Sequence, residues 1–369
     1  MEALVMKEEW DFVETLLPVH WQWQARRTGA LRRLRGASSI TNVLRLLMLH
    51  ISGGLSIEQT CVRARELGIA DVTAMALFKR LRLSQGWLLW MCEQLIKQRG
   101  ARGFDTAPLK NRRVLAVDAS DIREPAARAS SWRLHYALSL PTLRCEHAHF
   151  SSPEVAESLC NFPIEAGDVV MADRAYGTRS QLGWLKQQGA DAIVRVSPNH
   201  FLAQENAGEE TPSDLPFDWL KHLRTLKGYK PGEWKVRFTH EGKSYTARVC
   251  AVRKSVAAQQ KAIKAIEAEA RKKKRAVRAQ TLEYAKYVIV VCTLSEKELG
   301  TREALETYRS RWQVELAFKR LKSLLEAGSV PKTLESSALA WMQGKLLEAL
   351  LVEKLLEEAE VFSPWGHGM

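Results

Sequence analysis

The chain has 369 residues, a length that suits two or three domains better than one. Hydrophobic residues make up 46% and charged residues 26%, so the composition is that of a globular protein and excludes a disordered chain or a fibre. Lysine and arginine number 55 against 42 aspartate and glutamate. The formal net charge of +13 favours a nucleic-acid partner over an acidic membrane surface.

The sequence also indicates a cellular setting. No apolar run is long enough to span a bilayer, because Arg45, Lys345 and Glu348 interrupt the longest candidates. The acidic N-terminal segment is not typical of a secretory signal, and the six cysteines form no C-x-x-C pair. We therefore expect a cytoplasmic protein with free thiols and no membrane partner.

Residues 1–110 show the pattern of a helical domain. Apolar residues recur at helical spacing from Leu44 to Ile51, Ser56 with Gln59 resembles a capping box, and Thr73 can cap a further helix. The region holds sixteen Lys/Arg against ten Asp/Glu. A solvated helix face explains this excess as well as DNA binding does. An all-helical DNA-binding domain is therefore a hypothesis at this stage.

From residue 112 the pattern changes to alternating strands and helices. Short apolar runs predict buried strands, and alternating stretches predict half-buried ones. The predicted strands are 114–117, 132–143, 147–151, 168–172 and 192–196, with helices near residue 158 and at 178–189. This order favours a mixed α/β sheet.

Residues 198 to about 285 interrupt that pattern as a basic insertion. Trp234 to Cys250 is expected to form antiparallel strands. The stretch from Arg253 to Arg278 holds ten Lys/Arg against two Glu, so we expect it either to be a mobile solvated loop or to neutralise phosphates. Its densest patch is Lys272, Lys273, Lys274 and Arg275.

Two aspartates follow predicted strands. Asp118 comes after the run at 114–117, and Asp173 after the run at 168–172. A carboxylate at a strand end is anchored by the sheet yet reaches solvent, which suits a hard divalent cation. Taken singly, such an aspartate is more often a turn residue.

A long helix, predicted from about residue 302 to 326 after a strand at 287–294, carries the third carboxylate. At about 100° per residue, Tyr308, Arg311, Glu315 and Lys322 fall within an arc of roughly 60°, opposite an apolar face. Lys319 lies close to the same stripe. An ordinary amphipathic helix with Glu/Lys pairs is the simple alternative.

The three carboxylates together suggest a specific chemistry. Asp118, Asp173 and Glu315 could hold two Mg²⁺ ions, which activate the attacking oxygen and stabilise the leaving oxygen in phosphodiester cleavage. The neighbouring arginine and lysine side chains could then bind the phosphates beside the scissile bond.

At these residues the sequence resembles the IS4-type DDE transposases. The family signature Y-(2)-R-(3)-E-(6)-K is matched without a gap by Tyr308, Arg311, Glu315 and Lys322. The segment VDASD around Asp118 resembles the first acidic motif, although the family more often has Gly-Thr after the aspartate, and MADRAYG resembles the second. The resemblance covers roughly residues 40 to 330, and the 141 residues between Asp173 and Glu315 fit the β-rich insertion of this family.

The resemblance implies the fold and its division into domains. We expect a mixed α/β protein with an RNase H-like catalytic core over residues 111–330, interrupted by a β-rich basic insertion at about 198–285. A helical DNA-binding domain at 1–110 precedes the core, and a C-terminal helical segment at 331–369 follows it. That last segment suits dimerisation or packing on its own core.

The resemblance also implies cut-and-paste transposition of double-stranded DNA in a bacterial cytosol, at the nucleoid. A homodimer would bind the terminal inverted repeats. Two Mg²⁺ ions, which Mn²⁺ can replace, would support strand hydrolysis, transesterification through a hairpin, and joining to target DNA. The patch at 272–275, with Tyr308, Arg311, Lys319 and Lys322, would contact DNA.

Two aromatic residues are candidates for holding a flipped base in the hairpin. Tyr287 lies at about the distance before the signature at which the family places a tryptophan, and Trp312 projects near the active face. For both, packing is the favoured interpretation.

Several alternatives stay open. Cys145, His147 and His149 alternate and could be zinc ligands on one strand face, but a core strand is favoured. Arg195 at a strand end is as typical of the surface as of a phosphate contact. The whole protein could instead be a metal nuclease that does not join ends, or a non-catalytic or domesticated DNA-binding protein.

Overall fold

The computed structural model describes residues 10–34, 36–98, 109, 111–124, 131–205, 215–324, 330–332 and 334–361. The N-terminal region is helical, as predicted, and its helices begin at the expected caps. Ser56 and Gln59 form a capping box, and the Thr73 hydroxyl accepts the Ala76 N–H. The helices are residues 10–16, α2 (Trp21–Arg27), α3 (Ile40–Ser52), α4 (Ile57–Glu66), α5 (Ala74–Leu83) and α6 (Gln85–Lys97).

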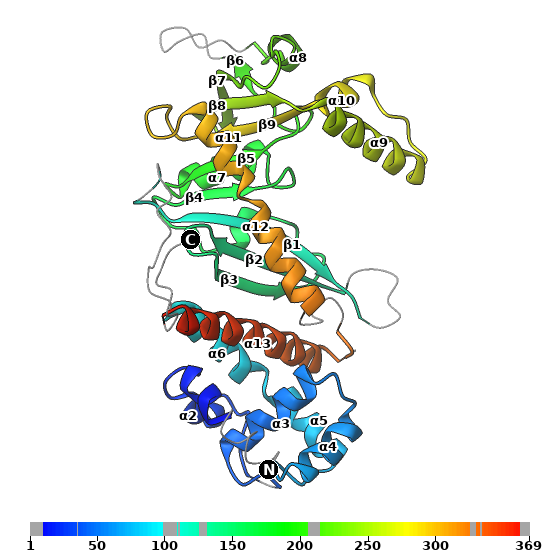
Figure 1. Ribbon diagram of the computed structural model, residues 1–369. Helices are drawn as coiled ribbons and strands as arrows, with labels where there is room; N and C mark the ends of the chain where they lie inside the picture. Colours follow the sequence, from blue (N-terminus) through cyan, green and yellow to red (C-terminus); the bar gives the residue numbers. More distant parts are fainter. Residues whose placement is uncertain are drawn as a thin grey trace.

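A nine-stranded sheet extends from the middle of the molecule to the end opposite the N-terminal helices (Figure 1). Its order is β3-β2-β1-β4-β5-β9-β8-β7-β6, with β1, β4 and β5 parallel and the other pairs antiparallel. The mixed α/β prediction is therefore confirmed. The strands are β1 (Val114–Ile122), β2 (Trp132–Ser139), β3 (Arg144–Ser151), β4 (Val169–Ala172), β5 (Asp191–Arg195), β6 (Gln204–Glu205), β7 (Gly232–His240), β8 (Lys243–Arg253) and β9 (Tyr287–Cys292).

The insertion extends this sheet. The predicted antiparallel strands are β7 and β8, and β9 joins them to β5 of the core. The expectation of a loop in the basic stretch is wrong for most of its length, because α9 (Val256–Lys272) is a helix capped by Ser255. Its alanine-rich sequence has high helix propensity. The short helices α8 (Trp219–Leu223) and α10 (Ala279–Tyr284) complete the insertion.

The predicted helix at 302–326 is divided into three parts. These are α11 (Thr301–Arg309), α12 (Trp312–Lys319) and a π-helical turn at Arg320–Leu324, while residues 325 and 326 lie outside the described residues. Between α11 and α12, backbone N–H groups donate to the carbonyl three residues earlier, as in Arg311 to Tyr308 at 3.1 Å. This tighter winding changes the angle per residue, so the arc calculated for a continuous α-helix does not apply.

Helices cover both faces of the sheet. On one face α12 packs on β1 and β2, and α11 packs on β5, β8 and β9. On the other face α7 (Arg179–Gln187) packs on β5 and β7, and the 3₁₀ turn Leu159–Asn161 contributes Leu159 to that core. The sheet thus separates two apolar cores.

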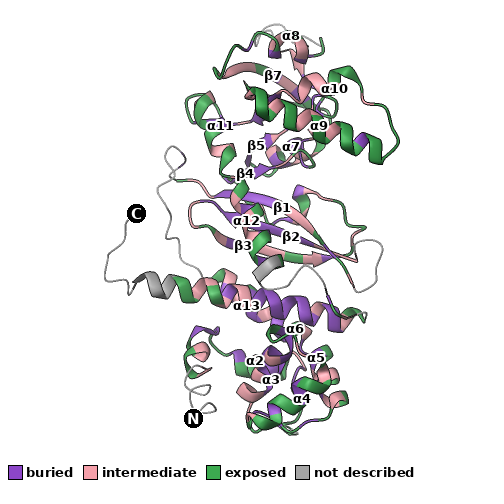
Figure 2. Ribbon diagram, turned by 45° about the vertical axis from the view of Figure 1, so that its right-hand side comes forward, coloured by how far each residue is buried: buried purple, intermediate pink, exposed green. Residues whose placement is uncertain are grey.

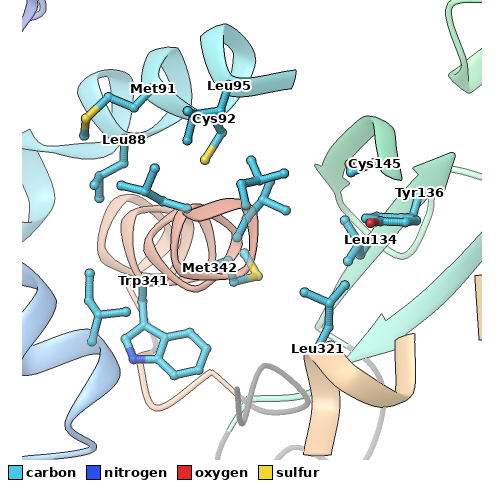
Figure 3. Close-up of a cluster of buried hydrophobic side chains, with 14 of the residues drawn as sticks. Leu88, Met91, Cys92, Leu95, Leu134, Tyr136, Cys145, Leu321, Trp341 and Met342 are labelled. Atoms are coloured by element: carbon cyan, nitrogen blue, oxygen red, sulfur yellow. The ribbon is translucent and has the colours of Figure 1, made fainter. Parts of the chain in front are cut away.

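The C-terminal helix α13 (Glu335–Val361) lies between the N-terminal helices and the sheet. Its residues from Trp341 to Leu347 are all buried, and Figure 2 shows this buried stretch along the helix. Figure 3 shows α6 on one side of α13 and Leu134 and Cys145 of the strands on another. The apolar surface of this stretch is therefore used within the chain, whereas Val352, Leu355 and Leu356 further along α13 are exposed.

One glycine allows this close packing. A Cβ atom on Gly344 would lie 2.4 Å from Cδ1 of the fully buried Ile51 in α3. None of the helices among the described residues has the length and apolar character needed to cross a membrane.

Candidate active site

The two aspartates lie side by side at one edge of the sheet. In the parallel pair of β1 and β4 the last paired residues are Ala116 and Met171, and Asp118 and Asp173 each stand two residues further on. Asp173 directly follows β4, as predicted. Asp118 is not at a strand end, because β1 continues to Ile122 by pairing with β2. The site therefore lies just beyond the point at which β1 stops pairing with β4.

Asp118 is held on the face of the sheet that α12 covers. Its strand partner Tyr136 contacts Phe318 of α12 on that face. One carboxylate oxygen accepts the Ala119 N–H at 2.9 Å and the other accepts Nη1 of Arg311 at 3.4 Å. Burial raises the pKa of Asp118 to about 6, and the negative charge of Asp173 acts in the same direction. An additional positive charge next to Asp118 would therefore stabilise its ionised form.

Asp173 is fixed by the turn after β4. Its Oδ1 accepts the Ala175 N–H at 2.7 Å, and the side chain is half-buried. The turn thus orients this carboxylate at the same edge as Asp118.

Arg311 connects Asp118 to the third carboxylate. Its guanidinium pairs with Asp118 and, through Nη2, with Oε1 of Glu315 one turn further along α12. Burial lowers the pKa of Arg311, but Tyr308 and the two carboxylates outweigh this effect, so the pKa is raised overall. The Glu315 side chain is 57% exposed. Arg311 therefore occupies the space between two of the predicted metal ligands.

A group of cations lies beside the carboxylates. Arg195 ends β5, and burial together with the nearby charge of Arg174 lowers its pKa. Burial also lowers the pKa of Lys254, which follows β8, to about 8, with Arg195 and Arg174 adding to the effect. Burial raises the pKa of Tyr308, while Arg311 and Arg195 oppose the rise. Such a concentration of positive charge at a half-buried edge suits an anionic ligand.

Sequence reasoning missed two of these residues. Arg174 adjoins Asp173 and could have been noticed for that reason. Lys254 comes from the insertion, 81 positions further along the chain than Asp173, and no sequence signal places it here. Arg195, for which a surface position and a phosphate contact were equally expected, lies at the site.

The other residues predicted for the site differ from one another in their contacts and in their exposure to solvent. Lys322 donates from Nζ to the backbone oxygen of Asp121 at 3.1 Å, at the end of β1, and Lys319 is exposed on α12. Trp312 is 50% exposed, so packing is the wrong interpretation for it. Tyr287 is 3% exposed, so packing is confirmed for this residue.

The basic patch at residues 272–275 lies at the outer end of α9, which projects from the insertion in Figure 1. Its residues are exposed, and Lys273 pairs with Glu269 of α9 at 2.6 Å. The patch therefore differs from Arg195 and Lys254 at the sheet edge, which are half-buried.

The suggested zinc ligands do not share a face. A bulge between β2 and β3 opposite Ala137 and Leu138 turns Cys145 into one core, while His147 and His149 stack on the opposite side. A bulge reverses the alternation on which the suggestion depended. The favoured interpretation, a strand in the core, is confirmed.

The donor set at the sheet edge suits divalent metal ions in chemistry but not in spacing. Three carboxylates supply only oxygen, the donor that Mg²⁺ prefers, and the raised pKa of Asp118 reflects its burial first and the charge of Asp173 second. Among the described residues no three potential ligands are close enough to hold an ion as they stand. Arg311 pairs with both Asp118 and Glu315 and so lies between them. The residues therefore fit a metal in their donor chemistry.

A half-sheet of order β3-β2-β1-β4-β5, with two aspartates at its edge and a glutamate on the covering helix, is that of an RNase H-like core. Residues 153–347 match the family model described as a transposase DDE domain. The transposase InsL for insertion sequence element IS186A of Escherichia coli (strain K12) is 31% identical over 361 residues, covering 95% of this chain and 94% of that protein.

A second relative, the transposase for insertion sequence element IS421 of Escherichia coli, is also 31% identical, over 362 residues, with the same shares of both chains. The chain therefore belongs to the DDE transposases, as the resemblance to the IS4-type family indicated. Membership brings DNA as the partner and a general use of divalent metal ions by the DDE domain.

Proposed function

We propose that this protein is a cut-and-paste transposase that cleaves and joins the ends of its own element. The observation that carries the proposal is that Asp118 and Asp173 stand at equivalent positions beyond the parallel pair of β1 and β4, and that Arg311 bridges Asp118 to Glu315. These residues are far apart in sequence, and a site that uses all three carboxylates accounts for their placement beside a group of cations.

Asp118, Asp173 and Glu315 would hold two Mg²⁺ ions, which Mn²⁺ can replace. When bound, the ions supply the charge that activates an attacking oxygen and stabilises the leaving one. Arg311 would exchange its two carboxylate partners for a phosphate beside the scissile bond. Arg195 lies close enough to Arg311 for the two positive charges to interact. Tyr308, Lys319 and Lys322 would position the same strand.

The ends would be processed through a hairpin by a homodimer bound to the terminal inverted repeats. Trp312 is the better candidate for stacking on a flipped base, because its ring is half-exposed next to Arg311, whereas Tyr287 would have to leave its core. The patch at 272–275 would contribute non-specific phosphate contacts, because its exposed charges have few protein partners.

The experiment that tests this proposal uses purified protein, Mg²⁺ and a labelled duplex that carries the inverted repeat flanking the gene. We expect nicking followed by a denaturation-resistant hairpin, and both products are lost in Glu315→Gln while DNA binding persists. Glu306→Gln is the matched control, because Glu306 is an exposed glutamate on α11 that pairs with Arg302 of the same helix.

The alternatives predict other products. Cleavage without a hairpin or a joined product would indicate a nuclease that does not join ends. Binding without cleavage in Mg²⁺ or Mn²⁺ would indicate a domesticated DNA-binding protein, and normal nicking by Glu315→Gln would remove Glu315 from the site.

A further inference from the structure

Helix α5 has an exposed face that the fold does not use. Its inward residues Leu77 and Leu81 are fully buried. Met75, Lys79 and Arg82 follow one another at spacings of four and three residues, so they lie on one face of the helix, and all three are exposed. The helix carries three Lys/Arg and no acidic residue.

The apolar residue on this face is as informative as the charges. Met75 stands in the first turn of α5 and is 74% exposed, the highest value, shared with Tyr229, among the large hydrophobic residues that the structure describes. Arg82 donates to the Ser336 hydroxyl at 3.3 Å and lies over the ring of Phe78. Neither Lys79 nor Arg82 forms an ion pair with another of the described residues. The face thus combines free positive charge with an exposed side chain of low polarity.

The connection between α4 and α5 is held in place by a glycine and by two contacts of Asp71. The connection from α4 begins with Gly68 at φ +65°, where an L side chain would be strained. It is then fixed by two contacts of Asp71, whose N–H donates to Gly36 O at 2.8 Å and whose carboxylate pairs with Arg65 at 2.8 Å. The Thr73 cap begins α5 directly afterwards. The two helices contact each other and are joined by residues 67–73, a connection longer than the three to four residues of the simplest helix–turn–helix turn.

We propose that α5 is the reading helix of a helix–turn–helix unit formed with α4 and enters the major groove of duplex DNA. Met75 contacts the base edges, and Lys79 and Arg82 contact phosphates on either side. The proposal rests on the proposed function, because it assigns to α5 the recognition of the element's ends. Ten residues of helix are about 15 Å long, and the major groove, about 12 Å wide, admits a helix whose N-terminal residues meet the bases.

A second copy of the chain is a less suitable occupant of this face. The protein carries a net charge of +13, so another copy would bring further positive charge to three Lys/Arg without an acid. Duplex DNA offers both phosphates for the charges and thymine methyl groups for the methionine.

The test measures binding of the full chain to two labelled duplexes, the inverted repeat that flanks the gene and a shuffled sequence of equal composition, over a range of salt concentrations. Met75→Ala is expected to reduce the preference for the repeat by about fivefold or more, the effect of losing one base contact. Lys79→Gln is expected to weaken binding to both duplexes equally and to lower the salt slope by about 0.9. Lys97→Gln, an exposed lysine at the end of α6, is the control and should change neither.

Three results would overturn the proposal. These are an unchanged preference in Met75→Ala, an equal effect of Lys97→Gln and Lys79→Gln, and a change of oligomeric state in Met75→Ala with the preference kept, which would make the face a protein contact. Measuring nicking in the same samples separates this proposal from the proposed function. Selective binding that depends on Met75, without any nicking, would support the reading helix and refute the transposase chemistry. Nicking that does not depend on Met75 would support the transposase chemistry and refute the reading helix.

Discussion

The strands β1 to β3 have two faces with opposite electrostatic properties, although residues with metal-binding chemistry occur on both. Asp118 is on the face that α12 covers, and its neighbour in sequence, Ala119, pairs with His135 on the other. Burial raises the pKa of Asp118 to about 6 and lowers the pKa of His135 to about 4, so burial alone favours the neutral form of each.

The difference lies in what surrounds each group. Asp118 lies near the carboxylate of Asp173 and pairs with Arg311, and Arg195 lies close to both of these residues. His135 forms a hydrogen bond with Ser151 at 2.9 Å, stacks with His149 and meets the ring of Phe162 edge to face, and no carboxylate among the described residues pairs with it. Potential ligands therefore indicate a site only where charges of both signs converge on them, and among the histidines on the other face only His135 is buried.

The largest effect should come from the carboxylate face. Asp118→Asn should reduce nicking of the end duplex by about 100-fold or more, because a neutral amide is a poor ligand for a divalent cation, while binding of the duplex is kept. Asp121→Asn is the control on the same strand, since Asp121 is exposed and pairs with Arg133 at 3.0 Å. Equal losses in both variants would show that the strand, and not the Asp118 carboxylate, matters.

The bridging arginine should have the next largest effect. Arg311→Ala should lower nicking by about 10- to 100-fold, because it removes the proposed phosphate contact. Arg311→Lys should restore only part of the rate, since an ammonium group cannot contact two partners as a planar guanidinium does. Arg302→Ala, on the exposed side of α11, should keep the wild-type rate. Full activity of Arg311→Lys would show that the positive charge of Arg311 matters and that its planar guanidinium does not.

The histidine face should act on stability and not on cleavage. The folded protein keeps His135 neutral down to about pH 4, whereas an unfolded histidine gains its proton near pH 6.5. Protons therefore bind the unfolded state more strongly in this range, and the free energy of unfolding falls as the pH drops from about 6.5 to 4.

His135→Gln removes this contribution, so its free energy of unfolding should change with pH less steeply than that of the wild type, by about 1–3 kcal/mol over this range. Urea unfolding at pH 7, 6 and 5 without metal measures the slope. His200→Gln, at an exposed histidine, should keep the wild-type slope. Identical slopes for all three proteins would mean that His135 is not the group that takes up the proton.

The smallest effect should come from the rejected zinc ligands. Because Cys145 and His149 lie on opposite sides of β3, His149→Asn should leave nicking within about twofold and should not alter the response of the melting temperature to Zn²⁺. A Zn²⁺-dependent rise in melting temperature that disappears in His149→Asn would show that the bulge does not separate the ligands in solution.

Local patterns were enough to predict much of the fold. The strand before Asp173 and the capping box at Ser56 depend on residues close in sequence, and both are confirmed. The helix at 302–326 was predicted as continuous because its side-chain pattern is helical throughout, and nothing in it marks the tighter turn at Arg311. The helix α9 was missed because charge dominated a segment whose alanines favour a helix.

The site could be predicted only in part. Its carboxylates were found because each has a local signature, a strand or a helix face, and because their combination has a chemical meaning. Arg195 and Lys254 come together only through the pairing of β5 with β9 and of β9 with β8, which no local pattern specifies. The position of Cys145 was predicted wrongly because a single extra residue in β3 reverses the side-chain direction.

The position of α13 has a consequence for synthesis of the protein on the ribosome. The core surface of α6, including Leu88 and Cys92, is covered by α13, and the Cys92 thiol bonds to the Gln343 carbonyl at 3.4 Å. More than 230 residues separate the two helices in the chain, so at about 5–20 residues per second roughly 12–50 seconds pass between their syntheses. Through that interval the N-terminal helices lack the partner that completes their core. A nascent chain therefore cannot present a finished α5 surface to DNA before the last helix has left the ribosome.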